Sequence, residues 1–91
     1  MKVKRVWKFQ LPIIDEFELM MPKGAQILSA QIQTGIPCLW ALVDPDEGQE
    51  LKRFRMAGTG HIIAEDAVEF VFIGTFQFDG LVIHLFEVKP E

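Results

Sequence analysis

Two short stretches of this sequence carry the residue types best suited to binding an anion. The first is the turn Gly58-Thr59-Gly60-His61, where glycines would let backbone N–H groups come close to a phosphate or carboxylate. The same four residues are also typical of a plain turn or bulge between two strands. The turn therefore predicts an anion site only in combination with other polar groups.

The second stretch is the C-terminal hairpin, which should place Thr75 and Gln77 on the same sheet face as His84. Asp79-Gly80 is the preferred pair for a two-residue type I′ turn, and such a turn sets Thr75 opposite His84. One interpretation is a polar binding patch. The alternative is a cross-strand Thr–His hydrogen bond at an exposed sheet edge.

Cations and an aromatic ring would complete one ligand site. Lys52, Arg53 and Arg55 form a basic cluster, and the ring of Trp7 is of a kind that stacks on a base. A solvated strand face explains the cluster, and core packing explains Trp7, without any ligand. The hypothetical site for an anionic, ring-bearing ligand comprises Trp7, Arg53, Arg55, Gly58, Thr59, Gly60, His61, Thr75, Gln77 and His84.

Groups for covalent or metal chemistry are scarce. The chain has two histidines and one cysteine, Cys38, which falls inside its most apolar run. Metal sites need clustered ligands, and nucleophiles need a nearby base. No HExxH, CxxC, P-loop or nucleophile-elbow pattern is present. We therefore expect a non-enzymatic protein with neither a cofactor nor a metal.

Composition and charge narrow the class further. The 91 residues suit a single domain, 1–91, with 49% hydrophobic and 24% charged residues. A net charge of −4 argues against duplex-DNA binding, which needs a basic surface. The chain shows neither a secretory apolar region nor a run long enough for a membrane helix. With its single cysteine, this predicts a cytoplasmic protein that does not bind membranes.

The strand on which the fold depends lies in Ala25–Asp44. The first half alternates, which predicts a half-buried strand whose core side carries Leu28, Ala30 and Ile32. The second half, Ile36–Val43, is a nearly unbroken apolar run, typical of a strand covered on both faces, with Trp40 in the core. Thr34-Gly35 supplies the turn between the two halves.

Alternating or apolar runs predict the remaining strands at residues 2–11, 17–21, 51–57, 68–78 and 81–88. Residues 62–67 are expected to form either an irregular loop or one helical turn, because AEDAVEF is too short for a stable helix. Six to seven strands with almost no helix predict an all-β fold, a small antiparallel sandwich or a partly open barrel.

The register set by Asp79-Gly80 sorts the last hairpin into two faces. The expected core face carries Phe72, Phe76, Phe78, Leu81, Ile83 and Leu85. The second face is expected to carry Ile73, Thr75, Gln77, Val82, His84 and Phe86, extended by Val71 and Val88. Because this second face is also partly apolar and few segments remain to cover it, we expect a homo-oligomer, a dimer or higher, joined through it.

Several longer motifs support a resemblance to known sequences. They are WKFQLP at 7–12, MPKGA at 21–25, IPCLWALVDP at 36–45, GTGH at 58–61, IGTFQ at 73–77 and HLFE at 84–87. On these motifs, the chain resembles a family of small uncharacterised proteins encoded by phages and bacteria, a domain of unknown function. The resemblance covers nearly the whole chain. It implies a free-standing domain in a phage or prophage context, within the host cytoplasm, and it implies no catalytic residue.

Two functions of different classes follow. The first is a non-enzymatic, oligomeric binding protein that traps a nucleotide-derived signalling molecule in a counter-defence role. The glycine turn, the basic clusters (Lys52, Arg53 and Arg55, and near the N-terminus Lys2, Lys4, Arg5 and Lys8) and the surplus apolar surface motivate it. The second is a protein–protein interaction module that docks on a host or phage protein through a sheet edge or an apolar face.

Overall fold

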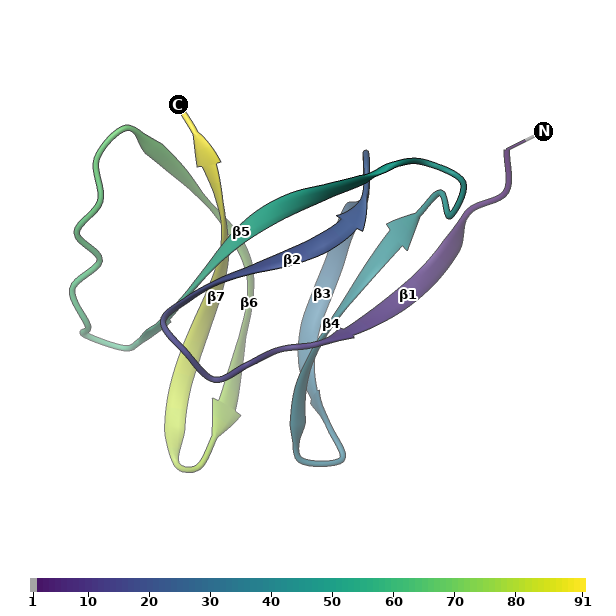
Figure 1. The fold of residues 1–91 in the computed structure, drawn as a ribbon. Coiled ribbons are helices and arrows are strands. Elements are labelled where there is room, and N and C mark those ends of the chain that lie inside the picture. The colour runs from purple at the N-terminus through teal and green to yellow at the C-terminus, as the bar shows by residue number, and fades with distance from the viewer. Residues whose placement is uncertain (1) are drawn as a thin grey trace.

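The computed structural model describes residues 2–91, which form seven antiparallel strands in two facing sheets (Figure 1). One sheet has the strand order β1-β4-β3 and the other β2-β5-β7-β6. The strands are β1 (Arg5–Gln10), β2 (Glu16–Pro22), β3 (Gln26–Gln33), β4 (Ile36–Val43), β5 (Gln49–Gly58), β6 (Val68–Phe78) and β7 (Leu81–Pro90). The predicted all-β sandwich is confirmed. No helix in residues 2–91 could cross a membrane.

The two tight hairpin turns form where the sequence predicts them. Both central residues have positive φ, 51° and 78° at Thr34-Gly35 and 51° and 76° at Asp79-Gly80. Such angles suit the right-handed twist of the flanking strands. Residues 62–67, for which a loop and a helical turn were both open, form an irregular connection between β5 and β6.

The core fills the space between the two sheets. Phe54 in β5 is 1% exposed and stacks on Phe17 in β2, with ring centroids 5.4 Å apart. Leu39 in β4 and Leu85 in β7, one from each sheet, are both fully buried. Since strand side chains alternate between faces, these residues define an inner face of each sheet. The opposite side of each sheet is its outer face.

A bulge in β3 changes which side chains enter this core. The pairing of β3 with β4 shifts register between Ile27 and Ser29. As a result Ile27 packs against the core and Leu28 is 46% exposed, so the prediction of Leu28 as a core residue is wrong. An extra residue in a strand reverses the side of everything that precedes it.

A second bulge, in β6, has the same effect on the last hairpin. Gly74 to Phe78 pair with β7 as predicted, and Thr75 lies opposite His84. The register then shifts between Phe72 and Gly74. Ile73 consequently packs against the core, whereas Phe72 is 59% exposed on the outer face, the reverse of the prediction. Val71 also leaves the predicted second face, because strand alternation places it on the inner side.

Trp40 is half-buried, so its predicted place in the core is wrong. It lies in β4, the middle strand of its sheet, between the fully buried residues Leu39 and Ala41. Alternation therefore directs Trp40 and Leu42 to the outer face, and both are only partly covered. Within residues 2–91 no third layer packs on that face, and although the small side chain of Cys38 is buried there, the larger Trp40 and Leu42 remain partly exposed.

The two sheets meet along one side of the sandwich, where β3 runs beside β6 without sharing a ladder. Here Gly74 lies against the backbone of Ala30. A Cβ atom at position 74 would lie 3.4 Å from the Ala30 carbonyl oxygen. A side chain as small as that of alanine would therefore just reach van der Waals contact with β3 at this point.

Candidate functional site

The structure brings the glycine turn and the polar patch of the last hairpin together at His84. Thr59 Oγ1 lies 2.8 Å from His84 Nε2, and Thr75 Oγ1 lies 2.9 Å from His84 Nδ1. A neutral imidazole has one donor and one acceptor nitrogen, and each threonine hydroxyl can serve either. Both nitrogens of His84 are thus satisfied, and the predicted cross-strand Thr–His hydrogen bond is present. We call Thr59, Thr75 and His84 the histidine bridge.

His61, two residues after Thr59, lies over Gly58 instead. The Gly58 N–H donates a hydrogen bond of 3.2 Å to His61 Nδ1. A Cβ atom at position 58 would lie 2.8 Å from His61 Cε1, closer than real Cβ contacts allow. The lack of a side chain at Gly58 therefore leaves room for the His61 imidazole, whose Nδ1 accepts the hydrogen bond. In the neutral ring the proton is then on Nε2.

The two arginines of the predicted site are engaged with carboxylates and with the β5–β6 loop. Arg53 Nη2 lies 2.8 Å from Glu65 Oε1, and this hydrogen bond together with the charge of Glu65 raises the pKa of Arg53. Arg55 Nη1 lies 3.2 Å from Glu16 Oε1, and its Nη2 donates to the Ile62 carbonyl at 3.4 Å. Both guanidinium groups therefore tie the β5–β6 loop to β5, and Arg55 also binds the neighbouring strand β2.

The remaining predicted residues are divided between the sheets. Gln77 is exposed on β6, on the same outer face as Thr75. Trp7 lies on β1 in the other sheet, where it packs against the core. Gly60 follows Thr59 in the turn with a φ of 86°. The ten candidate residues thus form three groups: the histidine bridge with its turn and with Gln77 on the same face, the paired arginines, and Trp7 in the other sheet.

An aromatic cluster that sequence reasoning missed lies on the outer face of the β2-β5-β7-β6 sheet. The ring of Phe86 meets Phe70 edge-on at 6.0 Å and Phe72 at 5.8 Å between centroids. Phe86 follows His84 by two residues, so both side chains share this face. Only the bulge in β6 places Phe70 and Phe72 here, and its one sequence signal was Gly74 inside the strand. We call Phe70, Phe72 and Phe86 the phenylalanine cluster.

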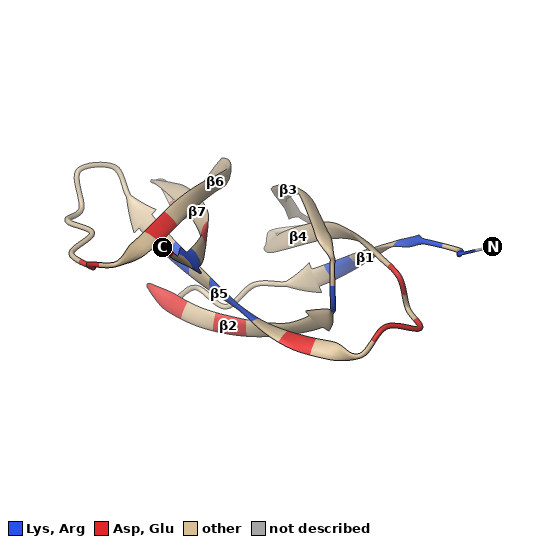
Figure 2. Ribbon diagram, turned by 90° about the horizontal axis from the view of Figure 1, so that it is seen from above, with Lys and Arg blue, Asp and Glu red and all other residues tan. Residues whose placement is uncertain are grey.

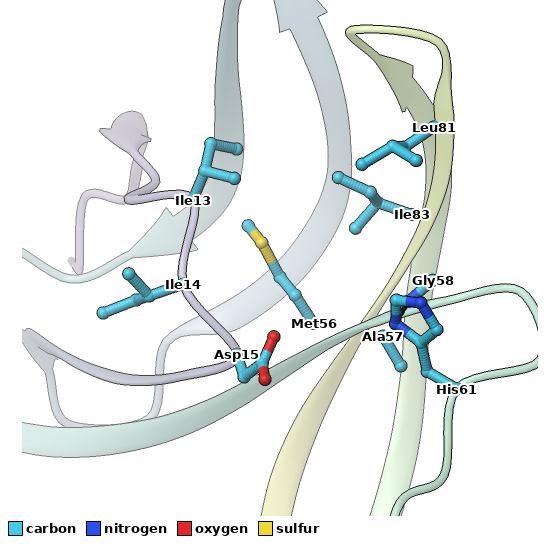
Figure 3. Close-up of a pocket in the computed structure, with 9 residues that line it drawn as sticks. All are labelled: Ile13, Ile14, Asp15, Met56, Ala57, Gly58, His61, Leu81 and Ile83. Carbon is cyan, nitrogen blue, oxygen red and sulfur yellow. Dashed lines mark hydrogen bonds between the residues drawn. The ribbon is translucent and has the colours of Figure 1, made fainter.

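An apolar pocket of about 110 Å³ opens beside His61 (Figure 3). Ile13 and Ile14, from the β1–β2 connection, lie on one side of the pocket, and Leu81 and Ile83 of β7 lie on the other. Met56, Ala57 and Gly58 of β5 lie between these two sides. Asp15 and His61 also line the pocket, and both lie in the lower part of the view. The lining comes from three distant segments, so its only sequence signal was an Ile-Ile pair outside a strand.

Charge is unevenly distributed over the surface. Figure 2 shows acidic residues along β2 and in the β4–β5 loop, and basic residues on β1. Lys2, which precedes β1, contacts the β4–β5 loop, with its Nζ 3.9 Å from Asp44 Oδ2 and 3.5 Å from Glu47 Oε1. Within residues 2–91, no three or more of the His, Cys, Asp and Glu side chains are grouped as metal ligands would be.

Comparison with known proteins gives one result. No curated protein and no solved structure matches this chain. A family model described as a domain of unknown function, DUF7352, matches residues 2–91, almost the full length. The resemblance to an uncharacterised family is thereby confirmed, and the chain belongs to the DUF7352 family.

Proposed function

We propose that this protein is a non-enzymatic interaction module that self-associates through the outer face of the β6–β7 hairpin. The phenylalanine cluster carries this proposal. Phe72 is 59% exposed although its ring is already ordered against Phe86 at 5.8 Å. Aromatic side chains, phenylalanine among them, are enriched at protein–protein interfaces relative to the rest of the surface.

The surroundings of the cluster fit an interface of this kind. Thr75, Gln77 and His84 lie on the same face and would form its polar edge. Interfaces between subunits commonly combine an apolar centre with a polar rim. Each buried Å² of apolar surface contributes about 25 cal/mol before the entropy of association is subtracted. The partner we propose is a second copy of this chain, because a two-fold axis would set the same cluster against itself.

The test is the molar mass in solution of the wild-type protein and of Phe72→Asp. Sedimentation equilibrium at micromolar concentration should give a multiple of the 10.4 kDa chain for the wild type and a single chain for the variant. The melting temperature of the isolated variant should change little, because substitutions at exposed positions usually alter stability by less than about 0.5 kcal/mol.

Leu28→Asp is the matched control, since Leu28 is 46% exposed but lies on the other sheet. It should leave the molar mass unchanged. A wild-type protein that stays monomeric at submillimolar concentration would overturn self-association. Capture of a different protein by the Phe72 face would then support docking on a host or phage protein, the context that the family resemblance implies.

A second candidate function is the trapping of a nucleotide-derived molecule, which the histidine bridge favours. Thr59 brings the glycine turn within 2.8 Å of His84, so two sequence candidates meet at one place. Hydroxyl and imidazole groups suit the polar edge of a base or a ribose. A thermal-shift screen with mononucleotides and cyclic dinucleotides tests this, because ligands that bind only the folded state raise its melting temperature. Thr59→Val should abolish any shift, and a screen without shifts would exclude the candidate.

A further inference from the structure

We infer that the apolar pocket beside His61 is a docking site for one apolar side chain of a partner peptide that carries a basic residue next to it. This pocket lies on the inner side of the β2-β5-β7-β6 sheet, since it is lined by Met56 and Ile83. The phenylalanine cluster lies on the outer side. The inference therefore concerns a second surface and does not depend on the proposed self-association.

The volume of the pocket limits its occupant. At about 110 Å³ it is smaller than an engineered cavity of about 150 Å³ that binds one benzene molecule. It is also well below the roughly 300–1,000 Å³ of sites that enclose a drug-sized ligand or cofactor. A branched aliphatic side chain, such as that of leucine, is therefore the size of group that the pocket would take.

The apolar residues around the mouth of the pocket offer a partner more surface than a single side chain would cover. Ile13 is 44% exposed, Ile14 is 54% exposed and Leu81 is 57% exposed, and all three line the mouth. A small free ligand would leave these aliphatic side chains in water. A peptide backbone passing over the mouth would cover them while its side chain filled the pocket, which is how anchor residues act in protein interfaces.

The walls of the pocket are already in place. Met56 is 4% exposed and Ile83 is 6% exposed, so both are fixed by core packing. The Asp15 carbonyl accepts a 2.8 Å hydrogen bond from the Met56 N–H, which ties the β1–β2 connection to β5. His61 is seated over Gly58 by its own hydrogen bond. A preformed site loses less entropy on binding than one that must be ordered.

The negative charge of Asp15 at the mouth of the pocket favours a basic residue next to the apolar side chain that fills it. Asp15 lines the pocket, and its carboxylate forms no ion pair within residues 2–91. The adjacent Glu16, in contrast, is paired with Arg55 at 3.2 Å. A lysine or arginine beside the anchor side chain would be complementary in charge to the exposed carboxylate of Asp15. The pocket thus fits an apolar–basic dipeptide within a longer segment.

The probe is the capped tetrapeptide acetyl-Gly-Leu-Lys-Gly-amide, added to the Phe72→Asp protein so that self-association cannot interfere. The readout is the Met56 methyl resonance in a carbon–proton NMR spectrum, identified by its loss in Met56→Leu. We expect a saturable shift of this resonance. Replacing the peptide's leucine by serine should abolish it. Replacing its lysine by glutamate should weaken binding by about two- to fivefold, as expected for one exposed ion pair.

Protein variants complete the test. Asp15→Asn should bind the lysine and glutamate peptides equally while keeping the leucine requirement. Ile14→Asp should weaken both peptides, whereas Ile62→Asp should weaken neither, because Ile62 is 84% exposed and lies outside the pocket lining. A Met56 methyl that does not respond to millimolar peptide, or that responds equally to the serine peptide, would overturn the inference.

Discussion

The imidazole of His61 occupies the space into which a side chain at Gly58 would project. The two residues are joined by a 3.2 Å hydrogen bond from the Gly58 N–H to His61 Nδ1. A Cβ atom at position 58 would lie 2.8 Å from Cε1 of the ring. The glycine of this turn is thus explained by the histidine that follows it, without any bound anion.

Gly58→Ala should displace the His61 ring at a small loss of stability. The ring belongs to an exposed side chain that can move away, so the loss should be that of one hydrogen bond, about 0.5–1.5 kcal/mol. Chemical denaturation measures this loss, and the NMR resonances of the imidazole report its displacement. The control is the double variant with His61→Ala: in that background Gly58→Ala should no longer be destabilising. An equal loss in both backgrounds would show that the two residues are not coupled.

Gly74→Ala should be tolerated at least as well as Gly58→Ala. The added Cβ would lie 3.4 Å from the Ala30 carbonyl oxygen, an ordinary van der Waals distance, whereas a Cβ atom at position 58 would lie 2.8 Å from the His61 ring. Because the Cβ at position 74 overlaps no atom, the free energy of unfolding should change by less than about 0.5 kcal/mol. Gly48→Ala is the matched control, because nothing lies within 4 Å of a Cβ atom there. A urea midpoint for Gly74→Ala well below that of Gly48→Ala would contradict this spacing of β3 and β6.

Phe54→Ala should unfold the domain, whereas Trp40→Ala should not. Phe54 is 1% exposed and stacks on Phe17, and truncation of a buried phenylalanine lowers stability by about 3–5 kcal/mol. Trp40 is half-buried on an outer face and should contribute roughly half as much. Circular dichroism during thermal melting distinguishes the two. A Trp40→Ala protein as unstable as Phe54→Ala would mean that the outer face of β4 is covered.

Lys52→Met should destabilise the protein, because it removes the positively charged partner of the Glu87 carboxylate. Lys52 Nζ lies 3.4 Å from Glu87 Oε2, and the side chains are 14% and 9% exposed. Removing one partner of a partly buried ion pair leaves the other without compensation, so we expect a loss on the order of 1–3 kcal/mol. The double variant with Glu87→Leu should recover most of it, because an apolar pair needs no compensation. Failure of the second substitution to restore the melting temperature would refute this account.

The local chemistry of the chain was sufficient to predict the strands and both tight turns. Asp79-Gly80 and Thr34-Gly35 adopt the positive φ angles that their residue types favour, and the turn at Asp79-Gly80 alone set Thr75 opposite His84. The two polar stretches were also recognisable, since their residue types are visible in the sequence. These features depend on neighbours in the chain, which is why a one-dimensional pattern contains them.

Tertiary structure decided where those residues point and what they meet. The bulges in β3 and β6 exchanged Leu28 for Ile27 and Phe72 for Ile73 in the core. In each case two consecutive residues are apolar, so the hydrophobic pattern alone does not determine which of them faces inward. The contact of Thr59 with His84 and the pocket between Ile13 and Leu81 were also decided by the tertiary structure. Each joins segments that only the packing of two sheets brings together, and the spacing of residues along a chain does not contain that distance.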